Sequence, residues 1–308
     1  MTTNNIIEID KPIDTLAWLE KRHRYNDKCI VGSSEVSVVM GANEYETIVD
    51  LAVRKLQPVQ SNPPTDAMTR GNVLEPALIQ HARNEMNIAL ETPNVMYLHN
   101  DVIATLDARG TGEHKNIVVE AKTNNRWTLG NDVPTTWWWQ AQAQMYCTDT
   151  EVVNFVVLDK HMRLGMQQVE RSNDGIAQMV ERVSAFCEAI NDERLPDDSV
   201  LTAPQVAALY KQPAGVVELT ADAFNLIGEW EAIKACLKEY EEREKQVKDA
   251  IANLMREHEF ASVNGQRVLS YKAQSTSRLD SKALATAHPE LVQQYTTAST
   301  FRVLRITK

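Results

Sequence analysis

Residues 102–122 read VIATLDARGTGEHKNIVVEAK and contain two short apolar runs. The runs, 102–107 and 116–122, have the length and the β-branched side chains that are typical of strands. Between them, the glycine-containing segment 109–112 predicts a turn, because glycine adopts backbone conformations that other residues avoid. The stretch therefore predicts two strands joined by a turn, placed so that they can pair.

Three charged side chains stand at the ends of these expected strands. Side chains alternate along a strand, so Glu120 and Lys122 share a face, and pairing of the strands would bring Asp107 beside Glu120. Two carboxylates next to a lysine suit magnesium-dependent phosphodiester cleavage, because hard oxygen ligands hold the metal. The metal polarises the phosphate and activates water, and an ammonium orients that water or steadies developing charge. Taken alone, the pattern also fits a solvated strand end.

The flanking sequence adds further motifs in a fixed order. Upstream lie WLEKR at 18–22, VGSSEV at 31–36 and RGNVLEP at 70–76, the last leading into apolar positions at helical spacing. Downstream, the segment 134–146 begins with a proline, which fits the first turn of a helix. A strand-like run at 152–158 follows it.

In this order and spacing, the motifs resemble the phage-type alkaline exonucleases, the λ exonuclease and YqaJ-like viral recombinase group of the PD-(D/E)xK nuclease superfamily. The resemblance covers residues 15–190. It implies an α/β (α+β) fold, with a nuclease core whose central mixed β-sheet is flanked by helices. It also implies a magnesium-dependent 5′→3′ exonuclease that digests linear double-stranded DNA and leaves 3′ single-stranded overhangs for phage or prophage recombination, with Mn²⁺ able to replace Mg²⁺.

The resemblance implies catalytic roles residue by residue. The implied metal ligands are Glu75, Asp107 and Glu120, to which we add the backbone carbonyl of Ala121 because it lies between two site residues. Lys122 is implied as the catalytic lysine, and Gln140 as a glutamine that points into the site. The tripeptide Leu-Asp-Ala at 106–108 stands where the family usually has Pro-Asp-Gly.

The resemblance also implies a pocket for a terminal DNA phosphate. Arg22 and Ser34 match the two motifs that imply it, and Arg126 is a looser candidate for the same pocket. Arg22 is further from Ser34 than the family pattern has it. Either an insertion separates them, or Arg24 or Lys28 makes the phosphate contact instead.

Net charge limits how such a protein holds DNA. The chain has a formal charge of −10, and residues 1–195 account for most of it, with 18 Lys and Arg against 27 Asp and Glu. The composition therefore argues against a generic, high-affinity electrostatic attraction to the phosphate backbone. The composition fits an enzyme that neutralises DNA locally with metal and a few arginines, and it also fits a protein that never touches DNA.

Cysteine usage and the first residues bear on cofactors and location. The four cysteines, Cys29, Cys147, Cys187 and Cys236, are far apart, which argues against a zinc or iron–sulfur site. We expect buried thiols in a reducing compartment. Residues 1–5 have no signal pattern and no long apolar run follows, so the expectation is a cytoplasmic location in a bacterial host and no membrane association.

Three parts are predicted along the chain: a nuclease domain at 1–195, a proline-containing linker at 196–216 and a C-terminal domain at 217–308. The C-terminal domain is expected to contain one long helix, a β-hairpin around Asn264-Gly265 and a third strand-like run at 300–306. Together the last two suggest a small β-sheet.

The long helix, expected over 219–258, has a heptad seam that can pack on another subunit or on its own domain. The seam is Leu226, Trp230, Ile233, Leu237, Tyr240, Glu244, Val247, Ile251 and Leu254. Three consecutive tryptophans, Trp137–Trp139, are expected in the core or at a subunit interface rather than stacked on bases. This apolar surface predicts association of subunits. The resemblance to a family whose processive members are toroids implies a closed homo-oligomer, a ring of three or four subunits.

The expected partners are double-stranded DNA ends and a single-strand annealing protein. Two alternatives stay open on the residues alone. One is a related endonuclease on the same fold, and the other is a non-catalytic phage protein of DNA binding or assembly.

Overall fold

The computed structural model describes residues 6–61, 63–196, 199–212, 214–297 and 302–306. The chain divides into two units, Met1–Lys211 and Gln212–Lys308, and each is described by itself. Helix α7 (Ala203–Leu209) lies within the predicted linker but packs on α3 (Ile48–Lys55), which extends the first unit to residue 211. The predicted domain limits stay a prediction.

The first unit is built around a five-stranded mixed sheet in the order β11-β10-β9-β8-β5. Strands β9 and β10 are parallel, and the other neighbours in the sheet are antiparallel. The strands are β5 (Leu90–Glu91), β8 (Ala108–Gly110), β9 (Ile117–Thr123), β10 (Val152–Leu158) and β11 (Leu164–Glu170).

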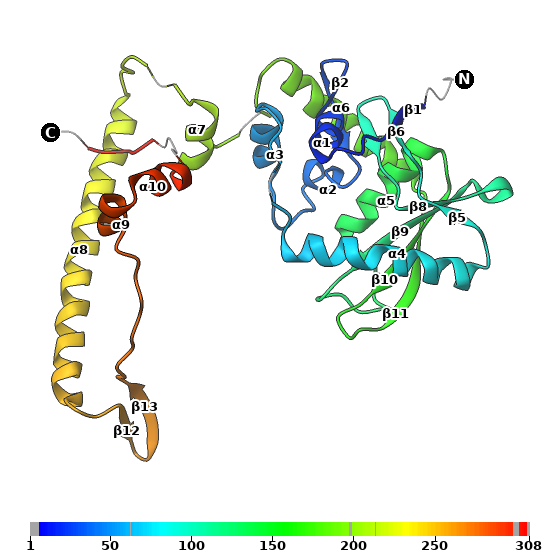
Figure 1. The fold of residues 1–308 in the computed structure, drawn as a ribbon. Coiled ribbons are helices and arrows are strands. Elements are labelled where there is room, and N and C mark those ends of the chain that lie inside the picture. The colour runs from blue at the N-terminus through cyan, green and yellow to red at the C-terminus, as the bar shows by residue number, and fades with distance from the viewer. Residues whose placement is uncertain (1–5, 62, 197–198, 213, 298–301, 307–308) are drawn as a thin grey trace. The chain divides into compact units, whose positions relative to one another are not determined.

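Helices cover both faces of this sheet (Figure 1). Helix α4 (Asp66–Met86) packs on β9 and β10 from one side, and α5 (Thr135–Thr148) packs on β10 from the other. The alternation of side chains along β10 explains both contacts: Phe155 belongs to the core cluster of α5, whereas Val156 belongs to that of α4. The predicted central mixed sheet flanked by helices is confirmed.

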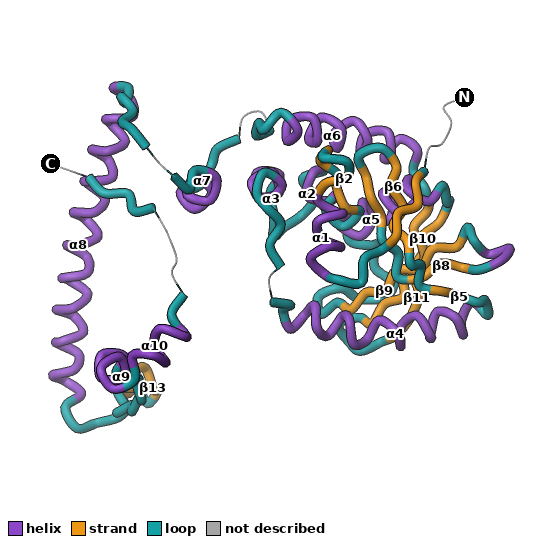
Figure 2. The backbone as a smooth tube through the Cα atoms, turned by 45° about the horizontal axis from the view of Figure 1, so that its top comes forward, coloured by secondary structure: helices purple, strands orange, loops and turns teal. Residues whose placement is uncertain are grey.

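A second sheet has the order β1-β6-β7-β4, and Figure 2 distinguishes its strands from the surrounding helices. Its strands are β1 (Ile7–Asp10), β4 (Val31–Gly32), β6 (Val95–His99) and β7 (Val102–Ala104). The remaining elements of the first unit are α1 (Thr15–His23), β2 (Arg24–Tyr25), β3 (Lys28–Cys29), α2 (Val36–Val39), the 3₁₀ helix η1 (Gly112–His114) and α6 (Asn173–Asn191).

The structure corrects the predicted pair of strands. The expected strand at 102–107 ends at Ala104, after which the chain crosses from the four-stranded sheet to the five-stranded sheet. The predicted turn at 109–112 is wrong for its first half, because β8 occupies 108–110. Gly110 is not a turn glycine: a Cβ at this position would collide with the carbonyl of His114. Gly110 is therefore needed because two backbone segments pack closely, not because the chain reverses direction there. The sequence alone does not distinguish these two uses of glycine.

In the second unit, α8 (Ala221–Met255) is the expected long helix. Strands β12 (Phe260–Val263) and β13 (Gln266–Ser270) confirm the predicted hairpin, and two short helices follow, α9 (Ser281–Ala287) and α10 (Pro289–Tyr295). Residues 302–306 form no strand, so the third strand is not found in the described part of 300–306. Hydrogen bonding to a sheet neighbour, not propensity, decides whether such a run becomes a strand.

Several apolar positions of the α8 seam are exposed within the described residues. They are Leu226, Ile233, Leu237, Tyr240, Val247 and Leu254. Cys236, on the same helix, is also exposed, which corrects the expectation of four buried thiols, whereas the other three cysteines are buried. Along the described part of the chain, no helix combines the length and the apolar character that crossing a membrane requires.

Candidate functional site

A cavity of about 850 Å³ in the first unit brings together most of the predicted site residues. Its lining includes Asp107, Glu120 and Lys122 of the 102–122 stretch, together with residues from three helices. The predicted residues among the lining are Arg22, Ser34, Glu75, Asp107, Glu120, Lys122 and Gln140. These residues come from widely separated parts of the sequence, so the tertiary structure alone creates the cavity.

Glu120, on β9, is the most heavily hydrogen-bonded side chain of the cavity. Its Oε1 accepts a hydrogen bond from Lys122 Nζ at 2.8 Å and another from Gln140 Nε2 at 2.6 Å. Its Oε2 accepts a hydrogen bond from Gln144 Nε2 at 2.6 Å. Lys122 also donates to Gln140 Oε1 at 2.9 Å. The carboxylate is only 5% exposed and is held by a cation and two amides.

Asp107 is placed beside Glu120 by the register of the sheet. Ala108 on β8 pairs with Val119 on β9, so the antiparallel register carries Asp107 toward the next residue of β9. Asp107 Oδ2 accepts a hydrogen bond from the backbone N–H of Ala121 at 2.8 Å. The predicted neighbourhood of Asp107 and Glu120 thus occurs, although β8 rather than the expected strand positions it.

The carboxylates of the cavity disfavour one another's charge. Burial raises the pKa of Asp107 well above its usual value, and the negative charges of Glu120 and Glu75 raise it further. Burial and the charge of Glu120 also raise the pKa of Glu75, which lies on α4. Such shifts are typical of sites in which acids are gathered for chemistry or for binding a cation.

The donor chemistry of the cavity fits a hard divalent cation, because Glu75, Asp107 and Glu120 provide only oxygen ligands. A dication would also relieve the repulsion among them. Ala121, predicted as a further ligand, lines a smaller pocket that shares Glu75. No group of three or more His, Cys, Asp or Glu among the described residues is already close enough to hold an ion.

Arg22 and Ser34 meet at another part of the same cavity. Arg22 Nη2 donates a hydrogen bond to Ser34 Oγ at 2.8 Å, and the guanidinium stacks on the Trp18 ring at 4.5 Å from its centroid. A Cβ on Gly32 would collide with this guanidinium, so only glycine leaves it room. Burial lowers the pKa of Arg22, although Glu35 opposes the shift. A desolvated arginine with several N–H groups suits an oxyanion.

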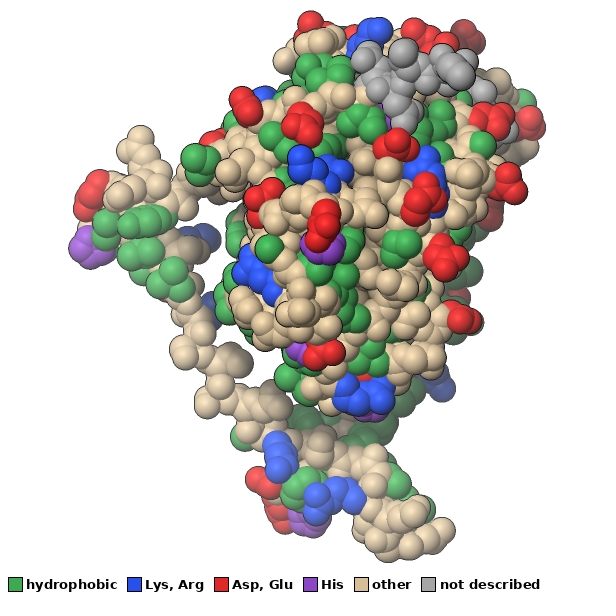
Figure 3. Space-filling view, turned by 90° about the vertical axis from the view of Figure 1, so that its right-hand side faces the viewer, with side chains coloured by type: hydrophobic (Ala, Val, Ile, Leu, Met, Phe, Trp, Pro, Cys, Tyr) green, Lys and Arg blue, Asp and Glu red, His purple; other side chains and the backbone are tan. Residues whose placement is uncertain are grey.

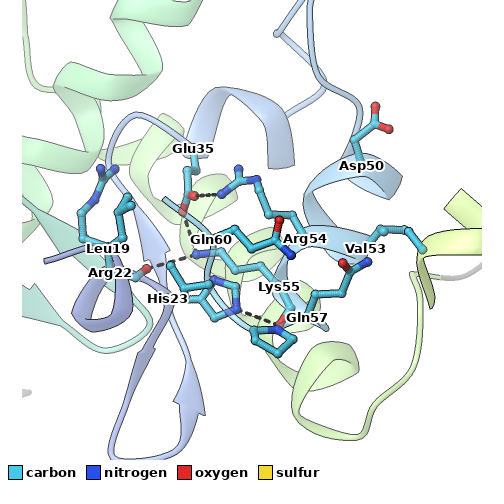
Figure 4. A pocket seen from close by; sticks show the side chains of 13 residues that line it. Leu19, Arg22, His23, Glu35, Asp50, Val53, Arg54, Lys55, Gln57 and Gln60 are labelled. Carbon is cyan, nitrogen blue, oxygen red and sulfur yellow. Dashed lines mark hydrogen bonds and ion pairs between the residues drawn. The ribbon is translucent and has the colours of Figure 1, made fainter. Parts of the chain in front are cut away.

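Behind Arg22 lies a buried ionic network, which lines a separate pocket of about 320 Å³ (Figure 4). Lys55, only 1% exposed, contacts Glu35 Oε2 at 2.9 Å and donates to the Arg22 carbonyl at 3.1 Å. Glu35 Oε1 accepts from Arg54 at 2.7 Å, and Oε2 accepts from the Gly32 N–H at 2.8 Å. Although burial alone would raise it, these cations hold the pKa of Glu35 well below its usual range.

Three other basic candidates for the phosphate pocket lie elsewhere. Arg126 is exposed and donates to the hydroxyl of Tyr45 at 2.6 Å, and it does not line the cavity of Arg22. Arg24 and Lys28 belong to the β2–β3 hairpin and are also absent from that lining. Of these arginines and lysines, the structure brings only Arg22 to Ser34.

Three further polar groups belong to the site but are not among the predicted site residues. Gln144 shares a face of α5 with Gln140, and this spacing is visible in the sequence. Thr105 Oγ1 and Trp18 Nε1 are buried with no hydrogen-bond partner among the described residues, and both side chains line the cavity. No sequence pattern identifies an unpaired hydroxyl, because pairing depends on which groups the fold brings nearby.

Comparison with known proteins relates part of this chain to a family. The chain is similar to the crystal structure of an alkaline exonuclease from Laribacter hongkongensis, at 23% identity and a TM-score of 0.46 over 53% of this chain and 89% of that one. It is also similar to a phage-related exonuclease from Haemophilus somnus 129PT, at 15% identity and a TM-score of 0.42 over 54% and 95%. No curated protein matches the chain. Residues 17–151 match the model of the YqaJ-like viral recombinase domain, the family that the motifs resemble.

Proposed function

We propose that the protein is a magnesium-dependent exonuclease that digests linear double-stranded DNA from its 5′ ends and leaves 3′ single-stranded overhangs. One observation carries the proposal: a single cavity contains an acidic centre of Asp107, Glu120 and Glu75 together with an arginine–serine pair. The domain family of residues 17–151 supports a role in viral recombination. Mn²⁺ is proposed to replace Mg²⁺.

The position of each residue supports a role in this proposal. Asp107, Glu120, Glu75 and the Ala121 carbonyl would hold the ion, which supplies Lewis acidity toward the phosphate and an activated water. Lys122 Nζ has three N–H donors, of which two contact Glu120 and Gln140. The third is available to orient the attacking water or to steady charge on the phosphate.

The arginine–serine pair supports the proposed polarity. Arg22 and Ser34 would hold the phosphate that ends the degraded strand, which is a 5′ phosphate in DNA whose ends carry one. The acidic centre would then act on a bond further along the same strand. Both groups line one cavity, which supports this arrangement.

Retention on DNA is proposed to depend on enclosure. The acidic first domain gives little general attraction to phosphates, and Figure 3 shows acidic side chains spread over one face of the molecule. A closed homo-oligomer of three or four subunits around the duplex would keep the enzyme on its substrate without such attraction. The 3′ overhang would pass to a single-strand annealing protein.

The test compares linear duplex DNA with the same plasmid in closed circular form, each with Mg²⁺ or with EDTA. The proposal expects acid-soluble nucleotides from the linear DNA with Mg²⁺ only. Release from 5′-labelled ends before 3′-labelled ends would support the polarity. Cleavage of the circular form would support an endonuclease instead. No metal-dependent cleavage of either form would leave a non-catalytic DNA-binding or assembly role.

A further inference from the structure

Gln144 lies on α5 one helical turn after Gln140, and its side chain reaches the same carboxylate. Gln144 is 0% exposed, and its Nε2 donates to Glu120 Oε2 at 2.6 Å. Gln140 donates instead to Oε1 of Glu120. The two amides therefore hold the two oxygens of one carboxylate separately, which limits rotation of the carboxylate about its own axis.

The number of acceptor positions on Glu120 is limited. A carboxylate has about four lone-pair positions, two on each oxygen. Oε1 accepts from both Lys122 and Gln140, which occupies its two positions. Oε2 accepts from Gln144 alone among the described residues, so one position remains there. If Glu120 ligates a metal with these contacts intact, the ligand atom is Oε2, through the position that Gln144 leaves open.

The other end of the Gln144 amide shows that this contact has a cost to stability. Gln144 Oε1 is buried without a hydrogen-bond partner in the described residues. A buried acceptor without a donor destabilises the folded state. Gln142, equally buried on the same helix, uses both ends of its amide: it donates to the Glu170 carbonyl at 2.8 Å and accepts from the Ser172 N–H at 2.7 Å. The Gln142 side chain thus bonds only to neighbouring backbone groups, whereas the Gln144 side chain bonds to the carboxylate of Glu120.

We infer that Gln144 is a positioning residue for the metal ligand Glu120, aiming the free lone pair of Oε2 toward the ion. The inference rests on the proposed metal-dependent function. Side chains that orient a metal ligand change metal affinity by about 10–100-fold when they are replaced. Gln144 should therefore affect ion binding even when no DNA is present.

The test measures Mn²⁺ binding to the full chain by isothermal titration calorimetry and by the electron paramagnetic resonance signal of the free ion. The variant is Gln144→Met, which keeps the length of the side chain and removes the donor. Its matched control is Gln142→Met, the same substitution at the same burial on the same helix. We expect the Kd for Mn²⁺ to rise about 10–100-fold in Gln144→Met. In Gln142→Met we expect an unchanged Kd and a lower melting temperature.

A wild-type Kd in a folded Gln144→Met overturns the inference and leaves the proposed function standing. A weaker Kd in both variants also overturns it, because it indicates a general effect of repacking α5. No Mn²⁺ binding by the wild-type protein refutes the metal site and the inference together. If Gln144→Met lacks the wild-type circular dichroism spectrum, Gln144→Asn takes its place, since the shorter amide withdraws the donor from Glu120 but stays polar.

Discussion

At the scale of single residues, the ammonium of Lys122 already makes hydrogen bonds within the protein. Its ammonium contacts Glu120 and Gln140, so its position is set before any substrate arrives. In the proposed cleavage, a preorganised charge near the phosphate would require little rearrangement during the reaction. Lys122 is half-buried, with a side chain 20% exposed, so substrate can still reach it.

We predict that Lys122→Met lowers the single-turnover cleavage rate by at least ~10²-fold, the range for a lost catalytic proton or charge partner. DNA binding should stay unchanged, because the ammonium is held mainly by groups of the protein. Filter binding and single-turnover kinetics separate the two effects. Lys115→Met, at an exposed lysine, is the control. A normal rate with weak binding would make Lys122 a phosphate clamp instead.

We predict that Asp107→Asn abolishes cleavage and stabilises the metal-free protein above neutral pH. The pKa of Asp107 is raised in the folded state, so its contribution to stability is present below the unfolded pKa and is lost as pH rises through the folded pKa. In EDTA, the melting temperature at pH 8 should therefore be higher in the variant than in the wild type. Mg²⁺ should raise the melting temperature of the wild type more than that of Asp107→Asn.

Two outcomes would contradict the prediction for Asp107. Wild-type cleavage by Asp107→Asn would remove Asp107 from the catalytic centre. A variant that melts below the wild type at pH 8 would mean that the hydrogen bond from Ala121 outweighs the repulsion by Glu120 and Glu75.

At the scale of elements, β4 and the start of α2 form a support for Arg22. Gly32 gives space to the guanidinium, and the next residues provide Ser34 as its acceptor and Glu35 as the anion behind it. Helix α3 completes the support with Lys55, whose ammonium also holds the Arg22 carbonyl. The backbone and the side chain of Arg22 are thus positioned by different elements.

We predict that Gly32→Ala removes the preference for phosphorylated DNA ends while the protein stays folded. The added Cβ meets the end of a flexible side chain, so Arg22 moves rather than the backbone. The measurement is the ratio of initial rates on 5′-phosphate and 5′-hydroxyl duplexes, which should fall toward one. Arg22→Ala should give the same ratio. A ratio equal to that of the wild type would show that the terminal phosphate binds elsewhere.

We predict that Glu35→Gln destabilises the first unit by about 3–5 kcal/mol, the cost of leaving one partner of a buried ion pair uncompensated. The uncompensated group is Lys55, whose side chain is 1% exposed. Urea unfolding measures the change. The double variant Glu35→Gln with Lys55→Met should recover part of the loss, because it removes both charges. No loss in the single variant would mean that the carbonyls around Lys55 suffice to hold its charge.

At the scale of the whole molecule, net charge and exposed apolar surface point to the same arrangement. A chain of −10 has little general attraction to DNA, yet α8 exposes apolar residues along a heptad seam. Such a seam is typical of helices that pack on a partner helix. Association of subunits through it would bury apolar surface and would support enclosure of the duplex.

We predict that the wild-type protein has a solution mass of three or four times its subunit mass of 34.7 kDa. Leu237→Lys, at an exposed seam position, should lower that mass and shorten processive digestion, because it buries a charge in the contact. Light scattering at micromolar concentration measures the mass. Glu239→Lys, off the seam, is the control. A monomer mass for the wild type together with processive digestion would refute the ring.

The sequence by itself determined the fold class and the strand that carries Glu120 and Lys122, since these depend on local periodicity and on motif order. Only the tertiary structure decided which strand pairs with which. The chain changes sheets after Ala104, so β8 rather than the expected strand positions Asp107. It also separated Arg126 from Arg22 and brought Gln144 to Glu120. Sheet pairing and side-chain contacts depend on groups far apart in the chain, so the pattern within one segment does not predict them.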